Sequence, residues 1–272
     1  MSGTLYIVAT PIGNLEDITY RAVRVLREAA LIACEDTRQT RKLLDHYGIS
    51  KPAVSYHEHN ERARSDELLH ELRHGKDVAI VSDAGTPLIA DPGYRLVEKA
   101  RREGVAVVPI PGPSAVIAAL SASGLPTDSF AFLGFLPAKA GQRRKTLEQA
   151  RSLGMTLVFY ETPHRIVEAL EDMVVVLGDT PVVLGRELTK LHEEFLSGPA
   201  AELRDRLRAR DSVKGEFTVI VGKWEAPVDE SIPVEREVEE LIESGVPRMD
   251  ALKQVARRRG MSKREVYKSF EK

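Results

Sequence analysis

The chain has 272 residues, 43% of them apolar, with a net charge of −2 from 39 basic and 41 acidic side chains. This length can bury a sizeable core in one large or two medium domains, and the charge balance excludes a protein that is polybasic throughout. A single cysteine, Cys34, excludes an intramolecular disulfide and a multi-cysteine metal site, and we expect it to be a small buried side chain. No signal-peptide pattern and no bilayer-spanning apolar run occurs, so we expect a soluble cytoplasmic protein.

Short β-branched runs alternate with amphipathic stretches through the first half of the chain. The pattern predicts five strands, in TLYIVAT, LIACE, AVSYH, DVAIVS and VAVVPI, separated by helices. This alternation is typical of a mostly parallel sheet in an α/β domain. Four glycines, at positions 48, 75, 104 and 124, each follow a helical pattern, where a left-handed residue is expected to end the helix.

A second round of strands and helices runs from FAFLGFLP to GEFTVIVGKW, and the stretch from HEEFLSG onwards leaves room for antiparallel pairing. We therefore predict two α/β domains, over residues 1–118 and 119–224, because each half is close to the usual domain size of roughly 100 residues. Residues 225–233, EAPVDESIP, are predicted to be a linker, since they combine two prolines and acidic residues with no periodicity.

Three short helices are predicted in residues 234–272, with a capping box formed by Ser262 and Glu265. Residues 245–272 hold nine basic and three acidic side chains, so this segment carries +6 although the whole chain is near neutral. A solvated helical surface would explain this charge. We favour the alternative, a small helix-turn-helix-like basic domain that faces phosphates.

Several common motifs are missing from the sequence. It has neither a G-x-x-x-x-G-K-[ST] phosphate loop nor a G-x-G-x-x-G after the first strand. GPSAV departs from the hydrolase elbow at Val116, so Ser114 fits a helix cap better. His57 and His59 are not one helical turn apart, as a helical zinc pair would be, and we predict no metal site.

Five irregular polar loops each follow a predicted strand: residues 9–17, 34–40, 56–61, 82–93 and 110–114. In open α/β sheets, ligands bind at the carboxyl edge of the strands, so these loops are expected to surround one crevice. Their Pro and Gly residues bring backbone N–H and C=O groups close to a ligand. The sequence therefore predicts a site for a small polar molecule that is recognised largely by the main chain.

Six segments carry a family resemblance: VATPIGNLEDIT, EDTRQTRKLL, VSDAGTPLIADPGY, PGPSAVIAALSASGLPTDSFAFLGFLP, FYETPHRI and GRELTKLHEEF. From Met1 to about Trp224 the chain resembles the tetrapyrrole methylase superfamily, most closely its ribosomal RNA small subunit methyltransferase I branch, and the C-terminal helices resemble that branch too. The resemblance implies two α/β domains with a cofactor cleft between them, and a homodimer. It also implies methyl transfer from S-adenosylmethionine to the ribose 2′-hydroxyl of a cytidine in the decoding region of 16S rRNA.

The same resemblance implies cofactor contacts from both halves of the chain. Carried over by position, they are Pro11, Gly13, Ser82, Asp83, Ala84, Gly85, Leu88, Ser114, Ala115, Pro163, Glu187, Leu188, Glu216, Phe217 and Thr218. The sharp turn at residues 83–85 would let main-chain groups reach the methionine part of the cofactor, although Asp83 could instead cap the turn.

Methyl transfer from a sulfonium needs in-line geometry and removal of a proton of high pKa, but no particular general base. The candidates for orienting or deprotonating the ribose hydroxyl are Glu35, Asp36, Arg38, His57, His59, Arg186, Glu187 and Lys190. Arg38 and Arg186 could pair with phosphates, and Lys190 could act as a base only if burial lowers its pKa. Each could equally form an ion pair between domains, so we favour the EDTR and GREL segments as groups.

Two other functions fit the same residues. One is a methyltransferase of the same fold acting on a tetrapyrrole or another small molecule; the other is a non-catalytic RNA-binding assembly factor. The basic C-terminal segment and the run Arg143, Arg144 and Lys145 favour an RNA backbone as partner. With 6% aromatic residues and no aromatic-rich strand motif, the chain does not resemble RNA readers that stack bases on a sheet.

Overall fold

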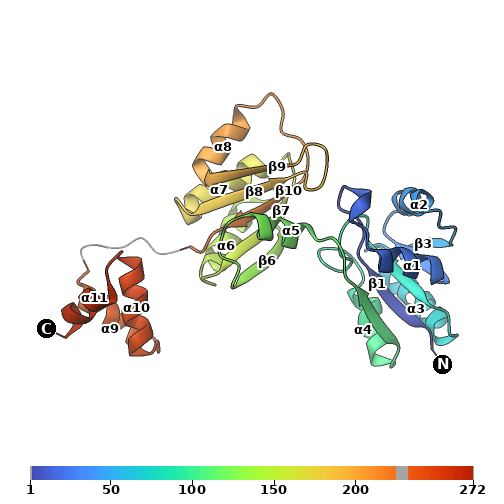
Figure 1. Ribbon diagram of the computed structural model, residues 1–272, viewed down its shortest axis with the longest axis horizontal. Coiled ribbons are helices and arrows are strands. Elements are labelled where there is room, and N and C mark those ends of the chain that lie inside the picture. Colours follow the sequence, from blue (N-terminus) through green and yellow to red (C-terminus); the bar gives the residue numbers. More distant parts are fainter. Residues whose placement is uncertain (1, 225–231, 272) are drawn as a thin grey trace. The chain divides into compact units, whose positions relative to one another are not determined.

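The structure is a computed structural model that describes residues 2–224 and 232–271 (Figure 1). The chain divides into two compact units, Met1–Lys223 and Trp224–Lys272. Most of the predicted linker, residues 225–231, lies outside the described residues. Within the described residues no helix has the length and apolar character needed to cross a membrane.

The first sheet is built as the sequence predicts, from five parallel strands in the order β3-β2-β4-β1-β5. The strands are β1 (Thr4–Val8), β2 (Leu31–Cys34), β3 (Ala53–Ser55), β4 (Val78–Val81) and β5 (Ala106–Ile110). Because every strand is parallel, all five carboxyl ends, and the polar loops that follow them, meet at one edge of the sheet.

Helices cover both faces of the first sheet, which makes its central strands apolar on both sides. Helices α1 (Tyr20–Glu28) and α2 (Thr37–His46) pack on the face that carries the buried Cys34, while α3 (Glu61–Arg73) and α4 (Tyr94–Arg102) pack on the other. A short 3-10 helix, η1 (Leu15–Asp17), precedes α1. The four predicted helix-ending glycines, Gly48, Gly75, Gly104 and Gly124, all have positive φ, between 61° and 80°.

The second sheet is mixed, in the order β6-β7-β10-β8-β9. Its strands are β6 (Phe130–Phe135), β7 (Thr156–Glu161), β8 (Pro181–Arg186), β9 (Glu194–Pro199) and β10 (Phe217–Val221). Only β6 and β7 are parallel; β10 pairs antiparallel with both β7 and β8, and β8 pairs antiparallel with β9. The predicted antiparallel pairing after HEEFLSG is therefore confirmed.

Helix α5 (Ala115–Ala122) belongs to the second sheet. Its buried Val116, Ala119 and Leu120 pack with Val158 of β7 and Ile220 of β10. The predicted division after residue 118 would cut this helix in two and is therefore misplaced: the change from one sheet to the other comes before α5. A continuous apolar stripe needs one partner surface, and the sequence does not say which sheet supplies it.

Three further helices alternate along the chain with the strands of the second sheet: α6 (Ala140–Arg151), α7 (Ile166–Leu177) and α8 (Ala200–Arg208). Contacts run from α6 to α7 and from α7 to α8, and α8 also contacts β9. Their buried side chains include Leu147, Leu170, Met173 and Leu203.

The unit Trp224–Lys272 contains α9 (Val234–Glu243), α10 (Arg248–Arg258) and α11 (Lys263–Phe270). The three helices bury Val238, Leu252, Val255 and Val266 in a core of their own. The three helices that the sequence predicts are therefore confirmed. Ser262 caps α11 and forms the predicted capping box with Glu265.

Candidate functional site

A cavity of about 280 Å³ lies where the loops at the carboxyl edge of the first sheet meet the ends of β7, β8 and β10. This is close to the lower end of the roughly 300–1,000 Å³ of small-molecule pockets. Eleven residues that the sequence singled out line it: Asp83, Ala84, Gly85, Ser114, Ala115, Glu187, Leu188, Lys190, Glu216, Phe217 and Thr218. Both halves of Met1–Lys223 therefore contribute to one cavity.

The loop after β4 approaches the loop after β1 through the main chain. Thr10 and Gly85 exchange two backbone hydrogen bonds, of 2.9 and 3.0 Å, and Gly85 has φ +78°. The Ser82 hydroxyl donates to the Ala84 carbonyl at 3.1 Å, which closes the turn. Glycine supplies the left-handed conformation that this turn needs, and a Cβ on Gly85 would lie in ordinary contact, 3.4 Å from Ile12 Cγ2.

Backbone strain concentrates in the two loops that line the cavity. Among the described residues, those with positive φ other than glycine are Leu88, Ala90, Glu187 and Thr189. Such conformations cost of order 1–3 kcal/mol each and persist only where the surroundings hold them, most often at functional sites. All four of these residues lie in the loops 82–93 and 187–193, so these two loops are the candidates for a functional role in this unit.

The loop after β8 is fastened to the loop after β1. The Asn14 N–H donates to Thr189 Oγ1 at 3.1 Å, and a Cβ on Gly13 would lie 2.3 Å from Lys190 Cγ. Lys190 Nζ donates to Glu187 Oε1 at 2.8 Å and to Glu216 Oε2 at 3.0 Å. The predicted cofactor residue Gly13 thus allows a close loop contact beside the cavity rather than forming its wall.

Lys190 does not have the lowered pKa that a general base would need. Burial disfavours its charged form, but the hydrogen bonds to Glu187 and Glu216 outweigh burial, and the pKa of Lys190 is raised above its ordinary value. The Lys190 hydrogen bond in turn lowers the pKa of Glu187. The condition under which Lys190 could act as a base, a pKa lowered by burial, is therefore not met, and Lys190 is a cation shared by two carboxylates.

The EDTR segment lies beside the cavity and does not line it. Asp36 is the N-cap of α2, and the Arg38 side chain, followed by the Arg38 N–H, lowers the pKa of Asp36 to about 2. Burial, and then the neighbouring Asp83 charge, raise the pKa of Glu35. Arg38 is 87% exposed, but its Nε and Nη2 donate to the Asp36 carboxylate at 3.1 and 2.8 Å.

Arg186 is used inside the fold. Its Nε donates to the Lys214 carbonyl at 2.6 Å, and its Nη1 lies 3.4 Å from Glu194, which also binds Arg210. The prediction that Arg186 pairs with a phosphate is not supported by this position, because carboxylate and carbonyl groups already surround the guanidinium.

The histidines of HEH also lie outside the cavity. The rings of His57 and His59 are 5.9 Å apart, and His57 Nε2 lies 3.3 Å from the Asn60 amide. No group of three or more His, Cys, Asp or Glu in residues 2–224 and 232–271 is arranged to hold a metal ion.

Four other predicted cofactor residues, Pro11, Ser82, Leu88 and Pro163, are not in the cavity wall. Ten wall residues were not predicted as cofactor contacts, although the first five lie in the predicted loops 9–17 and 82–93: Ile12, Thr86, Ile89, Ala90, Asp91, Phe135, Tyr160, Glu161, Thr162 and Gly185. One signal could have found several of them, because FYET ends a strand just as the five polar loops of the first half do.

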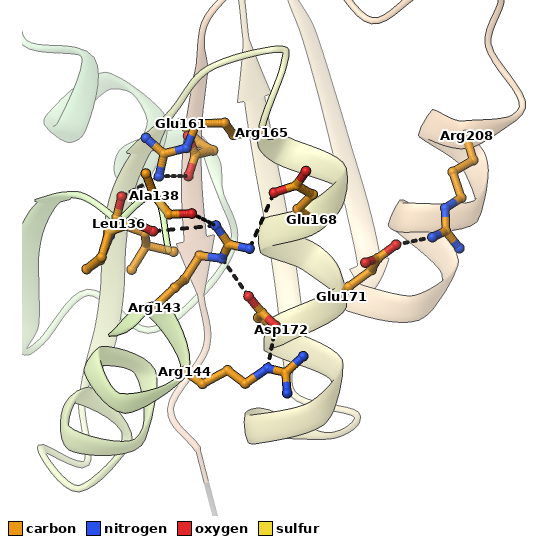
Figure 2. Close-up of polar contacts among 11 residues, drawn as sticks. Leu136, Ala138, Arg143, Arg144, Glu161, Arg165, Glu168, Glu171, Asp172 and Arg208 are labelled. Atoms are coloured by element: carbon orange, nitrogen blue, oxygen red, sulfur yellow. Dashed lines mark hydrogen bonds and ion pairs between the residues drawn. The ribbon is translucent and has the colours of Figure 1, made fainter. Parts of the chain in front are cut away.

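Arg143 is not an RNA contact. It is 2% exposed, and its Nε donates to Asp172 Oδ2 at 2.6 Å, while Nη1 donates to the Ala138 carbonyl at 3.1 Å (Figure 2). Its neighbour Arg144 binds the other oxygen of Asp172 at 2.6 Å, although half of the Arg144 side chain is exposed. The expectation that Arg143 contributes to a basic surface is wrong, because the apolar stripe of α6 turns this position inward.

The cavity fits the groups of S-adenosylmethionine. Glu161 is 2% exposed, and its Oε2 lies 3.4 Å from the Arg165 guanidinium but accepts no hydrogen bond from any described residue, so it can accept one from a ligand. Phe135, Tyr160 and Phe217 offer apolar faces for an adenine, and the carboxylates favour a cationic ligand.

A family model described as "Tetrapyrrole (Corrin/Porphyrin) Methylases" matches residues 4–204. The chain is 50% identical over 274 residues to "Ribosomal RNA small subunit methyltransferase I" of Halalkalibacterium halodurans, covering 98% of this chain and 94% of the relative. It is 46% identical over 269 residues to the protein of that name from Escherichia coli O157:H7, with the same two coverages.

Solved structures share the fold at lower identity. A diphthine synthase matches 81% of this chain and 90% of its own with a TM-score of 0.65 and 18% identity. The uroporphyrin-III C-methyltransferase of Thermus thermophilus, complexed with S-adenyl homocysteine, matches 81% of this chain and 98% of its own with a TM-score of 0.56 and 21% identity. At such identities these neighbours are evidence for the fold alone.

Proposed function

We propose that this chain, which belongs to the tetrapyrrole methylase family and to its ribosomal RNA small subunit methyltransferase I branch, transfers a methyl group from S-adenosylmethionine to a ribose 2′-hydroxyl of 16S rRNA. The observation that carries the proposal is identity of 45–54% to relatives with that name, over most or nearly all of the chain. The target, a cytidine in the decoding region, follows from the branch. Identity at this level favours the rRNA substrate over a tetrapyrrole.

When bound, S-adenosylmethionine supplies an electrophilic methyl group, and the chain has to hold it in line with the ribose oxygen. We assign the binding to the cavity residues of both sheets. Ala84 and Gly85 line the cavity from the first sheet, while Glu161 and the Glu187–Lys190 loop close it from the second.

The deciding experiment incubates the purified full chain with radiolabelled S-adenosylmethionine and small ribosomal subunits from cells that lack the enzyme. We expect label on a ribose of 16S rRNA. Label on a tetrapyrrole but on no ribosomal particle would favour the small-molecule methyltransferase. Cofactor binding with no label on any substrate would favour the assembly factor.

We also propose that the helical unit at the C-terminus binds the rRNA backbone. Two of its cations serve the fold, because Arg258 and Arg259 bind the buried Glu237 at 2.6 and 2.7 Å. Other cations, on α11, are exposed: Lys263, Arg264 and Lys268. These three are the ones placed to meet phosphates.

Replacing Lys263, Arg264 and Lys268 together by Ala is expected to weaken binding to small subunits and to lower its salt dependence. Each lost phosphate contact reduces the slope of log K against log salt by about 0.7 to 0.9. Titration at several salt concentrations measures the slope, with Arg236→Ala on α9, which pairs with Glu240, as the control. An unchanged slope in the triple variant would remove this unit from RNA binding.

We further propose a homodimer formed through the second sheet, in a cytoplasmic enzyme. Strand β6 is an edge strand, and its Phe130 and Leu133 are each 38% exposed. Exposed edges with apolar side chains are usually covered by a partner.

Light scattering should give twice the chain mass of 30.1 kDa, and Leu133→Asp should halve it. Leu153→Asp, at a comparably exposed leucine after α6, should leave the mass unchanged; a monomeric wild type refutes the dimer.

A further inference from the structure

We propose that Asp91 accepts the proton of the ribose 2′-hydroxyl during methyl transfer, and that the loop of residues 88–93 is shaped to hold its carboxylate in the cavity. This inference rests on the proposed function. Asp91 lies outside both segments that the sequence favoured for catalysis, and it lines the cavity next to Ala90 and Ile89.

The loop that carries Asp91 has an unusual backbone. Leu88 and Ala90 have φ of 72° and 66°, and Gly93 has φ 138°. A Cβ on Gly93 would lie 2.8 Å from Leu88 Cγ, so the loop folds back closely on itself. Strained conformations of non-glycine residues are retained where the surroundings impose them, and here they point to a side chain that must be held in one place.

The end of the loop is fixed by a carboxylate from α3. Glu61 Oε1 accepts the Gly93 N–H at 3.1 Å and the Tyr56 hydroxyl at 3.2 Å, and Glu61 Oε2 lies 3.4 Å from Arg95. The Glu61 side chain is only 13% exposed. This carboxylate therefore ties the end of the loop, two residues after Asp91, to the start of α3.

The groups that face Asp91 come from three elements. Glu35 follows β2, Ser82 and Asp83 follow β4, and Tyr160 lies on β7 of the second sheet. Burial, and then the Glu35 charge, raise the pKa of Asp91 to about 6, against the opposing hydrogen bond with Ser82. A carboxylate with this pKa is still ionised at neutral pH and is a far better base than Asp36, whose pKa is lowered to about 2.

Each of the other four carboxylates of the wall has a partner of its own, and Asp83 Oδ1 accepts the Asp36 N–H at 3.1 Å. Glu187 and Glu216 both accept hydrogen bonds from Lys190. Glu161 accepts the Thr162 N–H at 2.8 Å, and its second oxygen lies 3.4 Å from the Arg165 guanidinium. Within the described part of the chain, Asp91 forms no ion pair that would have to break before it accepts a proton.

The step balances as a substitution at the methyl carbon. The ribose 2′-oxygen forms the new O–C bond, while the C–S bond breaks and its electron pair stays on sulfur, which becomes a neutral thioether. The proton of the hydroxyl passes to a carboxylate oxygen of Asp91, and then to solvent when the product leaves. No further oxidant, reductant or co-reactant is needed.

The test compares Asp91→Asn with the wild-type chain on small ribosomal subunits. We expect kcat to fall by about 100-fold or more, the usual contribution of a general base. Calorimetry should give dissociation constants for S-adenosylmethionine and S-adenosylhomocysteine within about threefold of wild type. Asp91→Glu should recover part of the activity, and Asp66→Asn, at a 66% exposed residue paired with Lys99, should behave as wild type.

The pH profile separates a base from a structural group. Activity of the wild type should fall as the pH drops through about 6, because a protonated Asp91 cannot accept a proton, and Asp91→Asn should lose this acid limb. An Asp91→Asn variant that keeps its activity and its acid limb overturns the inference alone. So does one whose cofactor affinity falls as far as its turnover. A wild-type chain that labels no ribose overturns the proposed function and the inference together.

Discussion

Arg143→Met is expected to lower the free energy of unfolding by up to about 3–5 kcal/mol, because the buried Asp172 then keeps only the half-exposed Arg144 as a cation among the described residues. Arg143 and Asp172 are 2% and 3% exposed at their side chains, and their contact at 2.6 Å joins α6 to α7. The same guanidinium binds the Ala138 and Pro137 carbonyls, so the loop after β6 also loses its donor (Figure 2). The urea midpoint of the unit that contains both sheets measures the change.

Two further variants make the Arg143 result specific. Arg144→Met removes the other cation of Asp172 from a side chain that is 49% exposed, and it should cost about 1 kcal/mol or less. Combining Arg143→Met with Asp172→Leu replaces the pair by apolar groups and should recover much of the loss. Equal midpoints for Arg143→Met and Arg144→Met would contradict the buried-pair explanation.

Gly85→Val is expected to weaken the binding of S-adenosylmethionine by about tenfold or more, which corresponds to about 1.4 kcal/mol. Gly85 lines the cavity at φ +78°, and its N–H and C=O both bind Thr10. A β-branched side chain is strained in this conformation and would extend toward Ile12 and the space of the ligand. Calorimetric titration of the full chain with the cofactor gives the affinity.

Gly104→Val is the matched control for Gly85. Gly104 has a similar φ of +72°, but no atom lies within 4 Å of its Cβ position, and it follows α4 rather than lining the cavity. Both variants should therefore lose stability, whereas only Gly85→Val should lose cofactor affinity. Equal affinities would show that the turn at Gly85 does not approach the cofactor.

Much of the fold could be read from local patterns. The β-branched runs between residues 4 and 110 became β1 to β5, because strands that are covered on both faces are recognisable as short apolar segments. Gly48 and Gly104 end their helices as expected, since the left-handed conformation favours glycine at that position. The position of α5 could not be read, because its apolar stripe is compatible with either sheet.

The edge of the first sheet at which the cavity lies could be predicted from the sequence, whereas the individual residues of the cavity wall could be predicted only in part. Gly85, Ser114 and Glu187 line it as the resemblance implies, and their role in cofactor binding stays a prediction. Arg143 was expected at a surface, but sequence charge says nothing about which face of α6 turns inward. Asp91 was overlooked within a stretch that was itself singled out, since its importance depends on groups from β2 and β7 that approach it only in three dimensions.

The sequence by itself determined the parallel first sheet, the mixed second sheet, the capped helices of the C-terminus and the edge where the polar loops gather. These features depend on neighbours a few residues apart, through periodicity, caps and turn residues. Only the tertiary structure decided that Lys190 is a shared cation, that Arg186 and Arg143 serve the fold, and that Asp91 faces the cavity. The physical reason is that charge, burial and pKa are set by partners distant in sequence, which the chain brings together only on folding.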